Sequence, residues 1–180
     1  MNKKIAALLM AVLMLVCCAC GKKEEEAGTL SLETFEAADS FINDIYSEFG
    51  AEELPMMLMQ TELPMEDAEM LSFNRGITDT TGINSVIVSE SATGSIAYSM
   101  VYVIGAEDAD ADAILAQIME NIDPRKWVCV AAEKQAGFTM GNDVFFVMGA
   151  TDMIDTIVEH AQTKAEALGF VCGAVEEQVG

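Results

Sequence analysis

The chain has 180 residues, of which 30 are acidic and 9 are basic, so its formal net charge at pH 7 is −21. A surface of this charge repels phosphate backbones and excludes nucleic acid as a partner. Hydrophobic residues make up 52% of the sequence, which is ample for the core of one domain of ordinary size.

The first nineteen residues have the three-part pattern of a secretory signal peptide. Lys3 and Lys4 come first, and an unbroken apolar run from residue 5 to residue 16 follows. That run is too short for a membrane-spanning helix, which needs about 20 residues. Small residues then lead to Cys20 and Gly21. The pattern predicts an exported protein that loses residues 1–19.

The end of this signal resembles the lipobox of bacterial lipoproteins at Ala19, Cys20 and Gly21. The resemblance implies that the thiol of Cys20 receives a diacylglyceryl group and that the signal is cut just before it. Two acyl chains, such as palmitate, hold a protein stably at a membrane, whereas one chain is marginal. Cys18 is an alternative acceptor, but the small Ala19 favours Cys20. An ordinary secretory signal and an uncleaved anchor are the other interpretations.

The lipobox implies a lipoprotein on the extracytoplasmic face of a bacterial cell membrane. Residues 20–30 are then a lipidated acidic tether, in which Lys22 and Lys23 precede three glutamates. The stretch from Cys20 to Ser31 spans at most roughly 36 Å, so the domain is expected close to the bilayer. Residues 31–180 are expected to form a single α+β domain.

The first predicted helix covers residues 31–49. Apolar side chains from Phe35 to Phe49 recur at helical spacing, Ser31 is a candidate N-cap, and Gly50 ends the helix. Two prolines in residues 51–70 disfavour regular structure there. A short helix is expected at residues 66–73.

Methionines are concentrated in the segment with the prolines, as Met56, Met57, Met59, Met65 and Met70. Thioethers suit Cu(I), so these residues and the many acids suggest an alternative function as a metal-binding or metal-delivery lipoprotein. No His or Cys joins the group. Flexible methionines also fill irregular packing surfaces or form adaptable partner-binding surfaces. Packing is the favoured interpretation.

Two strands are expected next, at residues 84–89 and 96–104. Both faces of the second strand are largely apolar, which is typical of an interior strand. A helix is predicted at residues 107–122, and the acids at its start suggest a calcium loop. Ala113 and Met119, however, stand where an EF-hand needs Gly and Glu. The acids are therefore interpreted as an N-cap and a first turn favoured by the helix dipole.

A hairpin and a third helix complete the predicted elements. Strands at residues 133–140 and 144–149 flank the turn Gly141-Asn142-Asp143. The second of these strands is apolar on both faces and is expected at the centre of a sheet. The third helix is predicted at residues 152–168, with Thr151 as its N-cap.

Four further residues are candidates for chemistry. A Ser-His-acid site would have to use His160, the single histidine, but no nucleophile-elbow motif surrounds any serine, so a solvated imidazole is favoured. Trp127, in the ambiguous apolar stretch 127–132, is expected to anchor the core or its rim. Cys129 and Cys172 form either a disulfide or two buried free thiols.

Three segments carry a wider resemblance: Glu62-Leu63-Pro64 leading to Gly76-Ile77, the strand at 97–104 before an acidic helix start, and the run from Gly141 to Val147. Through them, residues 30–165 resemble an uncharacterised family of lipoproteins from clostridial and related Gram-positive bacteria, domain of unknown function 4358. Small polar residues at 95–99 and the stretch 127–132 depart from the family pattern. The family brings no known activity and implies only an exported, lipid-anchored, small α/β-type domain.

The predicted elements follow the order α-β-β-α-β-β-α, and their short connections favour antiparallel hairpins. The predicted fold is an α+β two-layer sandwich, with an antiparallel sheet of about four strands and helices on one face. The predicted function is a lipid-anchored binding or interaction module, not an enzyme, that uses no cofactor and meets an envelope protein or peptide. This prediction follows from the anchor at Cys20 and from the lack of a catalytic, metal or phosphate motif in the sequence.

Overall fold

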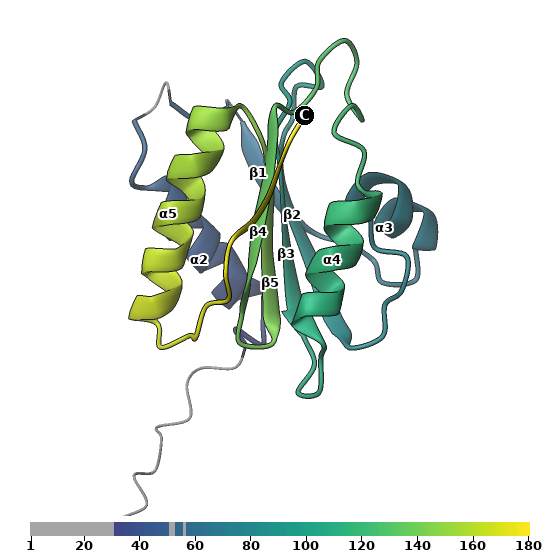
Figure 1. The fold of residues 1–180 in the computed structure, drawn as a ribbon, viewed down its shortest axis with the longest axis vertical. Helices are drawn as coiled ribbons and strands as arrows, with labels where there is room; N and C mark the ends of the chain where they lie inside the picture. Colours follow the sequence, from purple (N-terminus) through teal and green to yellow (C-terminus); the bar gives the residue numbers. More distant parts are fainter. Residues whose placement is uncertain (1–30, 51–52, 56) are drawn as a thin grey trace, which may run out of the picture.

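The computed structural model describes residues 31–50, 53–55 and 57–180. Cys20 and the predicted signal and tether lie outside this part of the chain, in which ten elements follow one another (Figure 1). The helices are α2 (Phe35–Tyr46), α3 (Ala68–Arg75), α4 (Ala111–Asn121) and α5 (Thr151–Ala167). The strands are β1 (Leu58–Glu62), β2 (Ile83–Ser91), β3 (Ser99–Gly105), β4 (Lys134–Met140), β5 (Asp143–Gly149) and β6 (Glu176–Val179).

All six strands form one antiparallel sheet in the order β1-β2-β3-β5-β4-β6. Strands β3 and β5 lie at its centre, and every residue of both is buried. The predictions of interior strands at 96–104 and 144–149 are therefore confirmed. The predicted hairpin is confirmed as well, because β4 and β5 pair from Lys134 with Gly149 down to Met140 with Asp143.

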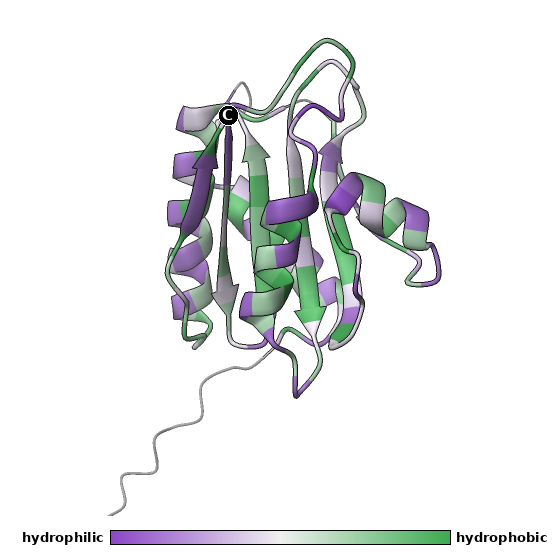
Figure 2. Cartoon of the chain, turned by 45° about the vertical axis from the view of Figure 1, so that its right-hand side comes forward, coloured by the Kyte–Doolittle hydropathy of each residue, from purple (hydrophilic) through white to green (hydrophobic). Residues whose placement is uncertain are grey.

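Helices cover both faces of this sheet, so the prediction that all helices lie on one face is wrong (Figures 1 and 2). Helices α2 and α5 pack on one face, where Phe41 and Ile157 join a core with Tyr102 and Phe145. Helix α4, with α3 beside it, packs on the other face over a second core that includes Phe146. The α+β class and the antiparallel sheet are confirmed, but the arrangement has three layers.

The two edge strands account for the difference in strand number. Strand β1 pairs with β2 at one edge, and β6 pairs with β4 at the other. Neither was predicted, so the expected count of about four strands is too low. The predicted order α-β-β-α-β-β-α is also wrong, because it lacks β1, α3 and β6. The side chains of β6 are all exposed, and those of β1 are exposed or half-buried. An edge strand needs no apolar alternation, which explains why these two segments carry little strand signal.

The helix starts differ in detail from the predictions. Thr34 caps α2 by accepting a hydrogen bond from the amide of Ala37, so the prediction of Ser31 as N-cap is wrong. Asp110 caps α4, as the interpretation of its acids requires. Thr151 is the first residue of α5 and not its cap, and the helix has no side-chain cap. The backbone amide of Thr151 instead donates to the carboxylate of Glu133.

The sheet has two ends with different roles, which we call the entry pole and the far pole. The entry pole contains the β4–β5 turn and the end of β3, and the chain enters there because the amide of Leu32 donates to Asp143 Oδ2 at 2.8 Å. Asp143 is fully buried and also accepts from the Tyr102 hydroxyl and the Gly105 amide. The far pole contains the ends of β2 and β5 and the loop between α4 and β4 (Figure 1).

Candidate functional site

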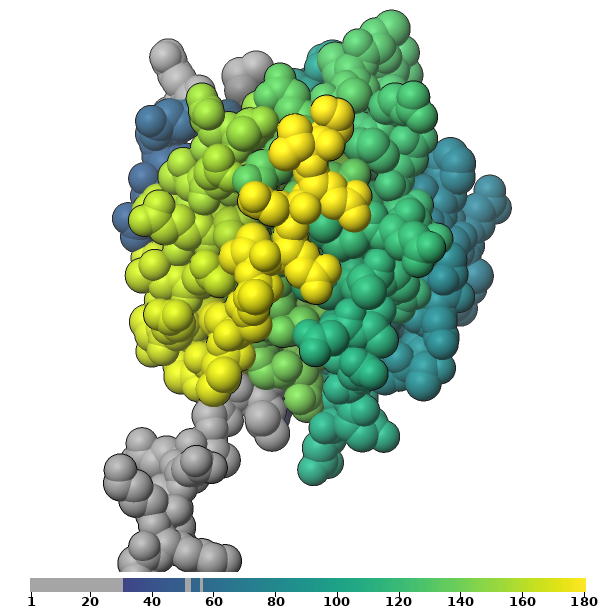
Figure 3. Space-filling view, in the orientation of Figure 1, coloured from purple at the N-terminus to yellow at the C-terminus, as the bar shows by residue number. Residues whose placement is uncertain are grey.

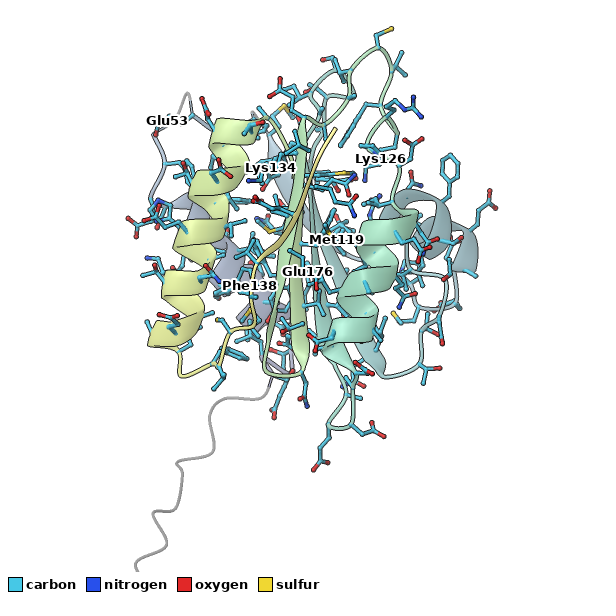
Figure 4. All side chains as sticks on the ribbon, viewed as in Figure 1. Glu53, Met119, Lys126, Lys134, Phe138 and Glu176 are labelled. Atoms are coloured by element: carbon cyan, nitrogen blue, oxygen red, sulfur yellow. The ribbon has the colours of Figure 1, made fainter. Side chains whose placement is uncertain are left out.

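The far pole holds a cluster of four polar side chains between the sheet and α3, and we refer to Arg75, Glu90, Ser99 and Lys126 as the far-pole cluster. Glu90 and Ser99 face each other across β2 and β3. Arg75 is the last residue of α3, and Lys126 belongs to the α4–β4 loop. Four separate segments therefore meet at one point, and Figure 4 shows Lys126 above the end of α4.

The carboxylate of Glu90 is the centre of this cluster. It accepts from Arg75 Nη2 at 2.8 Å, from Lys126 Nζ at 2.7 Å and from the Ser99 hydroxyl at 2.8 Å. Lys126 Nζ also donates to Ser99 Oγ at 3.0 Å and to the carbonyl of Asn74 at 2.9 Å. All three donor positions of the ammonium group are thus used. The lysine thereby fastens the α4–β4 loop to the sheet and to α3.

Two cations share one carboxylate in this cluster, and their side chains are 8% exposed for Arg75 and 4% for Lys126. Burial, reinforced by the charge of Arg75, lowers the pKa of Lys126 to about 8. Burial also lowers the pKa of Arg75. For Glu90, burial opposes ionisation, but the positive charges of Lys126 and Arg75 outweigh it and hold the pKa of the carboxyl below its usual value. The cluster therefore carries one excess positive charge near neutral pH.

The contact between Ser99 and Lys126 has the spacing of a nucleophile and its base. Ser99, however, is fully buried, and its hydroxyl donates to Glu90. A substrate carbonyl has no access to an oxygen in this position. We therefore interpret the far-pole cluster as the support of a surface loop.

The α4–β4 loop contributes lining residues to two hollows in the surface of the far pole. One has a volume of about 410 Å³, and apolar side chains such as Leu54, Ile96 and Val130 line it together with Glu53 and Glu133. The other has a volume of about 250 Å³ and lies beside the end of α4. Val128 of the same loop is 77% exposed. The supported loop thus presents apolar surface to the solvent.

The methionines of the predicted metal site belong to different elements. Met57 and Met59 are exposed at β1, Met70 is exposed on α3, and Met65 packs against the second core. Packing, the favoured interpretation, thus holds for Met65 alone of these four, and Met56 lies outside the described residues. Among the residues described, no group of three His, Cys, Asp or Glu side chains could hold a metal ion.

The remaining candidates are also dispersed. His160 is half-buried on α5 and meets the ring of Phe49 edge-on at 5.4 Å between centroids. Cys129 and Cys172 are both free thiols, Cys129 exposed and Cys172 half-buried, so the disulfide is absent and the expectation of two buried thiols is also wrong. Trp127 packs against the second core, as expected, and lies beside the ammonium of Lys126 at 5.3 Å.

Sequence reasoning missed the far-pole cluster itself. Arg75, Glu90 and Lys126 are far apart in the chain, and only the β2–β3 register and the docking of α3 bring them together. The sequence did contain one signal for Lys126. The chain has only 9 basic residues, and Lys126 is next to its single tryptophan.

Comparison with known proteins adds no identification. No protein-family model, no curated protein and no solved structure matches the chain. The resemblance to clostridial lipoproteins therefore rests on the residues that suggested it. In the described part of the chain, no helix has both the length and the apolar character to cross a bilayer. The fold and the cluster define a small three-layer α+β domain with a supported apolar loop at one pole.

Proposed function

We propose that this protein is a lipid-anchored extracytoplasmic binding module, without catalysis, that meets an envelope protein or peptide with its far pole. The observation that carries the proposal is the placement of the two poles. Leu32, close to the predicted anchor in the sequence, is fastened to Asp143 at the entry pole. The exposed apolar loop around Val128 lies at the opposite end of the sheet.

The chemistry of the far pole supports a partner that is partly apolar and partly basic. The larger hollow is lined mainly by apolar side chains, and Glu53 and Glu133 add negative charge to it. The large excess of acidic over basic residues attracts a cationic partner from a distance. An exposed apolar patch with a polar rim is a common feature of protein-binding surfaces.

The proposed surface can be tested by cross-linking in cells. A photoreactive amino acid is placed at Val128 and, as a control, at Ala116, an exposed position on α4. Adducts with an envelope protein or peptide, identified by mass spectrometry, are expected at position 128 and not at position 116. Equal adducts at both positions, or none at position 128, would contradict the proposal.

The anchor requires a separate test. Cys20→Ala removes the predicted lipid acceptor, and the variant should move from the membrane fraction to the soluble fraction. Cys18→Ala serves as the matched control and should stay with the membrane. A Cys20→Ala protein that remains in the membrane would show that the anchor assignment is wrong.

The metal-binding alternative remains a second prediction. It is tested by calorimetric titration of Cu(I) and Ca²⁺ into the protein. A saturable heat that is lost in the double variant Met57→Leu/Met59→Leu would support it. The absence of saturable heat for both ions would end it.

A further inference from the structure

Strand β1 is an edge of the sheet, and its backbone groups divide into two sets. The strand lies at one end of the sheet and pairs with β2 alone. The amide of Leu63 donates to the carbonyl of Val86, and the carbonyl of Met57 accepts from the amide of Ala92. Successive residues of a strand direct their backbone groups alternately to its two sides, so the odd-numbered residues of β1 bond with β2.

The even-numbered residues Leu58, Gln60 and Glu62 direct their amide and carbonyl groups away from β2. With the other described residues, these outward groups form no hydrogen bond. Glu62 is exposed, and the other two residues are half-buried. A row of unpaired donors and acceptors of this kind can pair with an extended strand from another chain.

The opposite edge of the sheet is better protected. Strand β6 has only four residues, and two of them are glutamates. Figure 3 shows the last residues of the chain lying between α4 and α5. Strand β1 has five residues and a single charge, that of Glu62. Because short length and charged side chains are common protections of an edge, β1 is the edge that suits the addition of a strand.

The face of β1 toward α3 is apolar at this edge. Met59 lies directly opposite Glu90, and Glu90 contacts Arg75 of α3, so Met59 is on the α3 side of the sheet. Met59 is 60% exposed, and Met57, just before the strand, is 67% exposed. Apolar side chains of an added strand are therefore favoured on this face.

The face of β1 toward α2 is acidic. Gln60 Nε2 donates to Asn43 Oδ1 of α2 at 3.4 Å, and Asn43 in turn donates to the carboxylate of Asp39 at 3.1 Å. Glu62 is on the same face as Gln60. In the described part of the chain, neither Asp39 nor Glu62 forms an ion pair. Residues 31–74 also contain no lysine, arginine or histidine. This side of the edge thus attracts positive charge and repels a second copy of the chain.

We propose that the β1 edge binds an extended basic segment of a partner protein or peptide as an added antiparallel strand. Lysine or arginine side chains of this segment lie beside Glu62 and Asp39, and they alternate with apolar side chains beside Met59. The outward backbone groups of β1 supply the main-chain hydrogen bonds. The inference goes beyond the proposed function, because it adds a second surface that does not depend on the loop around Val128.

The test is calorimetric titration of a short peptide, in which lysine and valine alternate, into the full-length protein in mild detergent at about 0.15 M salt. In an antiparallel pair, residues that exchange hydrogen bonds are directly opposite and share a face, so the amides of the lysines donate to β1. N-methylation of the lysine amides should weaken binding at least about tenfold. N-methylation of the valine amides, which point away from β1, should have little effect.

Two results of this titration would overturn the inference. One is the absence of saturable binding of the unmodified peptide. The other is a lysine-methylated peptide that binds as tightly as the valine-methylated one, or more tightly. A dimer by native mass spectrometry that Gln60→Pro converts to a monomer would assign the edge to a second copy of the chain and would also overturn it.

Proline substitutions locate the surface. Gln60→Pro removes the central outward amide of β1 without removing a hydrogen bond to β2, and should weaken the peptide at least about tenfold. Val179→Pro is the matched control on β6. The amide of Gly180 donates to Glu133, so the amide of Val179 points away from β4. This control should bind the peptide like the wild type.

Glu62→Gln keeps the test decisive if Gln60→Pro does not fold. It changes an exposed residue and keeps the oxygen that accepts from the Ser85 hydroxyl. The variant should bind the peptide about threefold more weakly, the usual effect of one exposed charge pair. Glu159→Gln, at an exposed carboxylate of α5, should have no effect. Equal binding by these two variants would exclude the β1 edge.

Cross-linking at Val128 separates this inference from the proposed function. Adducts at position 128 that persist while the alternating peptide does not bind would remove the β1 surface and keep the far-pole binding module. Peptide binding that is lost in Gln60→Pro, without any adduct at position 128, would keep the β1 surface and remove the far-pole one.

Discussion

At the scale of single residues, the charges of the far-pole cluster are unequal in number, because two buried cations share one carboxylate. Glu90→Gln leaves both cations without a counter-charge and should lower the free energy of unfolding by about 3–5 kcal/mol. Lys126→Met leaves the pair of Arg75 and Glu90 intact and should cost less, roughly 1–2 kcal/mol. Urea denaturation of both variants measures the difference. An equal loss in both would show that the excess positive charge has no energetic effect.

Lys126 should also make the free energy of unfolding depend on pH. Its pKa is lowered to about 8 in the folded protein from an ordinary value of 10.5, so between these values the unfolded chain binds more protons than the folded one. Stability should therefore rise with pH from about 8, by up to roughly 1.4 kcal/mol per pH unit from this group. Unfolding of the wild type and of Lys126→Met, compared from about pH 7.5 to about pH 9.5, isolates this contribution.

The tyrosines set the upper limit of that pH range. Burial raises the pKa of Tyr46 to about 12 and that of Tyr98 well above its usual value. Above about pH 10 the unfolded chain loses these protons before the folded one does, so stability falls there. A wild-type protein whose stability relative to Lys126→Met does not rise between about pH 8 and about pH 9.5 would contradict the role of Lys126.

At the scale of elements, Gly76 lies where the end of α3 packs against α4. It ends α3 with φ of 72°, and a Cβ at this position would lie 2.8 Å from the backbone of Ile118 and of Ile122. The left-handed conformation alone costs a non-glycine residue roughly 1–2 kcal/mol, and the contact with α4 adds to it. Gly76→Ala should therefore lower the free energy of unfolding by more than about 2 kcal/mol.

Gly94→Ala is the matched control, since apart from its own chain neighbours no atom lies within 4 Å of a Cβ there. Thermal or urea unfolding should show almost no effect of this change. A Gly76→Ala protein as stable as Gly94→Ala would mean that α3 and α4 can separate without cost.

The elements also show how much the sequence could predict. Periodicity found α2, α4, α5 and the strands of the sheet centre, because a stripe or an alternation of apolar side chains is a local signal. The central strands also show why the prediction of helices on one face only was wrong. Both faces of β3 and β5 are apolar, so both faces need a cover. Strand β6, with only exposed and mostly polar residues, has no such signal.

The candidate site lay further beyond prediction, for a related reason. The contact of Glu90 with Arg75 and Lys126 depends on strand register and on the docking of a short helix. Sequence patterns identify which groups are apolar, whereas the far-pole cluster is defined by which polar groups meet.

At the scale of the whole molecule, the fastening of Leu32 to Asp143 determines which pole lies nearer the start of the chain. With a lipid on Cys20 and a tether that spans at most roughly 36 Å, the entry pole should on average lie closer to the membrane than the far pole. Labelling of cysteines with a bulky, membrane-impermeant maleimide can measure this orientation. Cys129 reports on the far pole because it is exposed there. Glu107→Cys, in a Cys172→Ala background, reports on the entry pole, since Glu107 is exposed and its carbonyl accepts from Asn142 in the β4–β5 turn.

In intact cells without their wall, Cys129 should react at nearly the same rate in the anchored protein and in the purified Cys20→Ala form. The cysteine at position 107 should react several-fold more slowly when the protein is anchored, because the bilayer hinders a bulky reagent on that side. A chain whose two cysteines are slowed equally would have no preferred orientation. Slower labelling of Cys129 alone would place the far pole against the membrane, and the partner surface would then have to be sought at the entry pole.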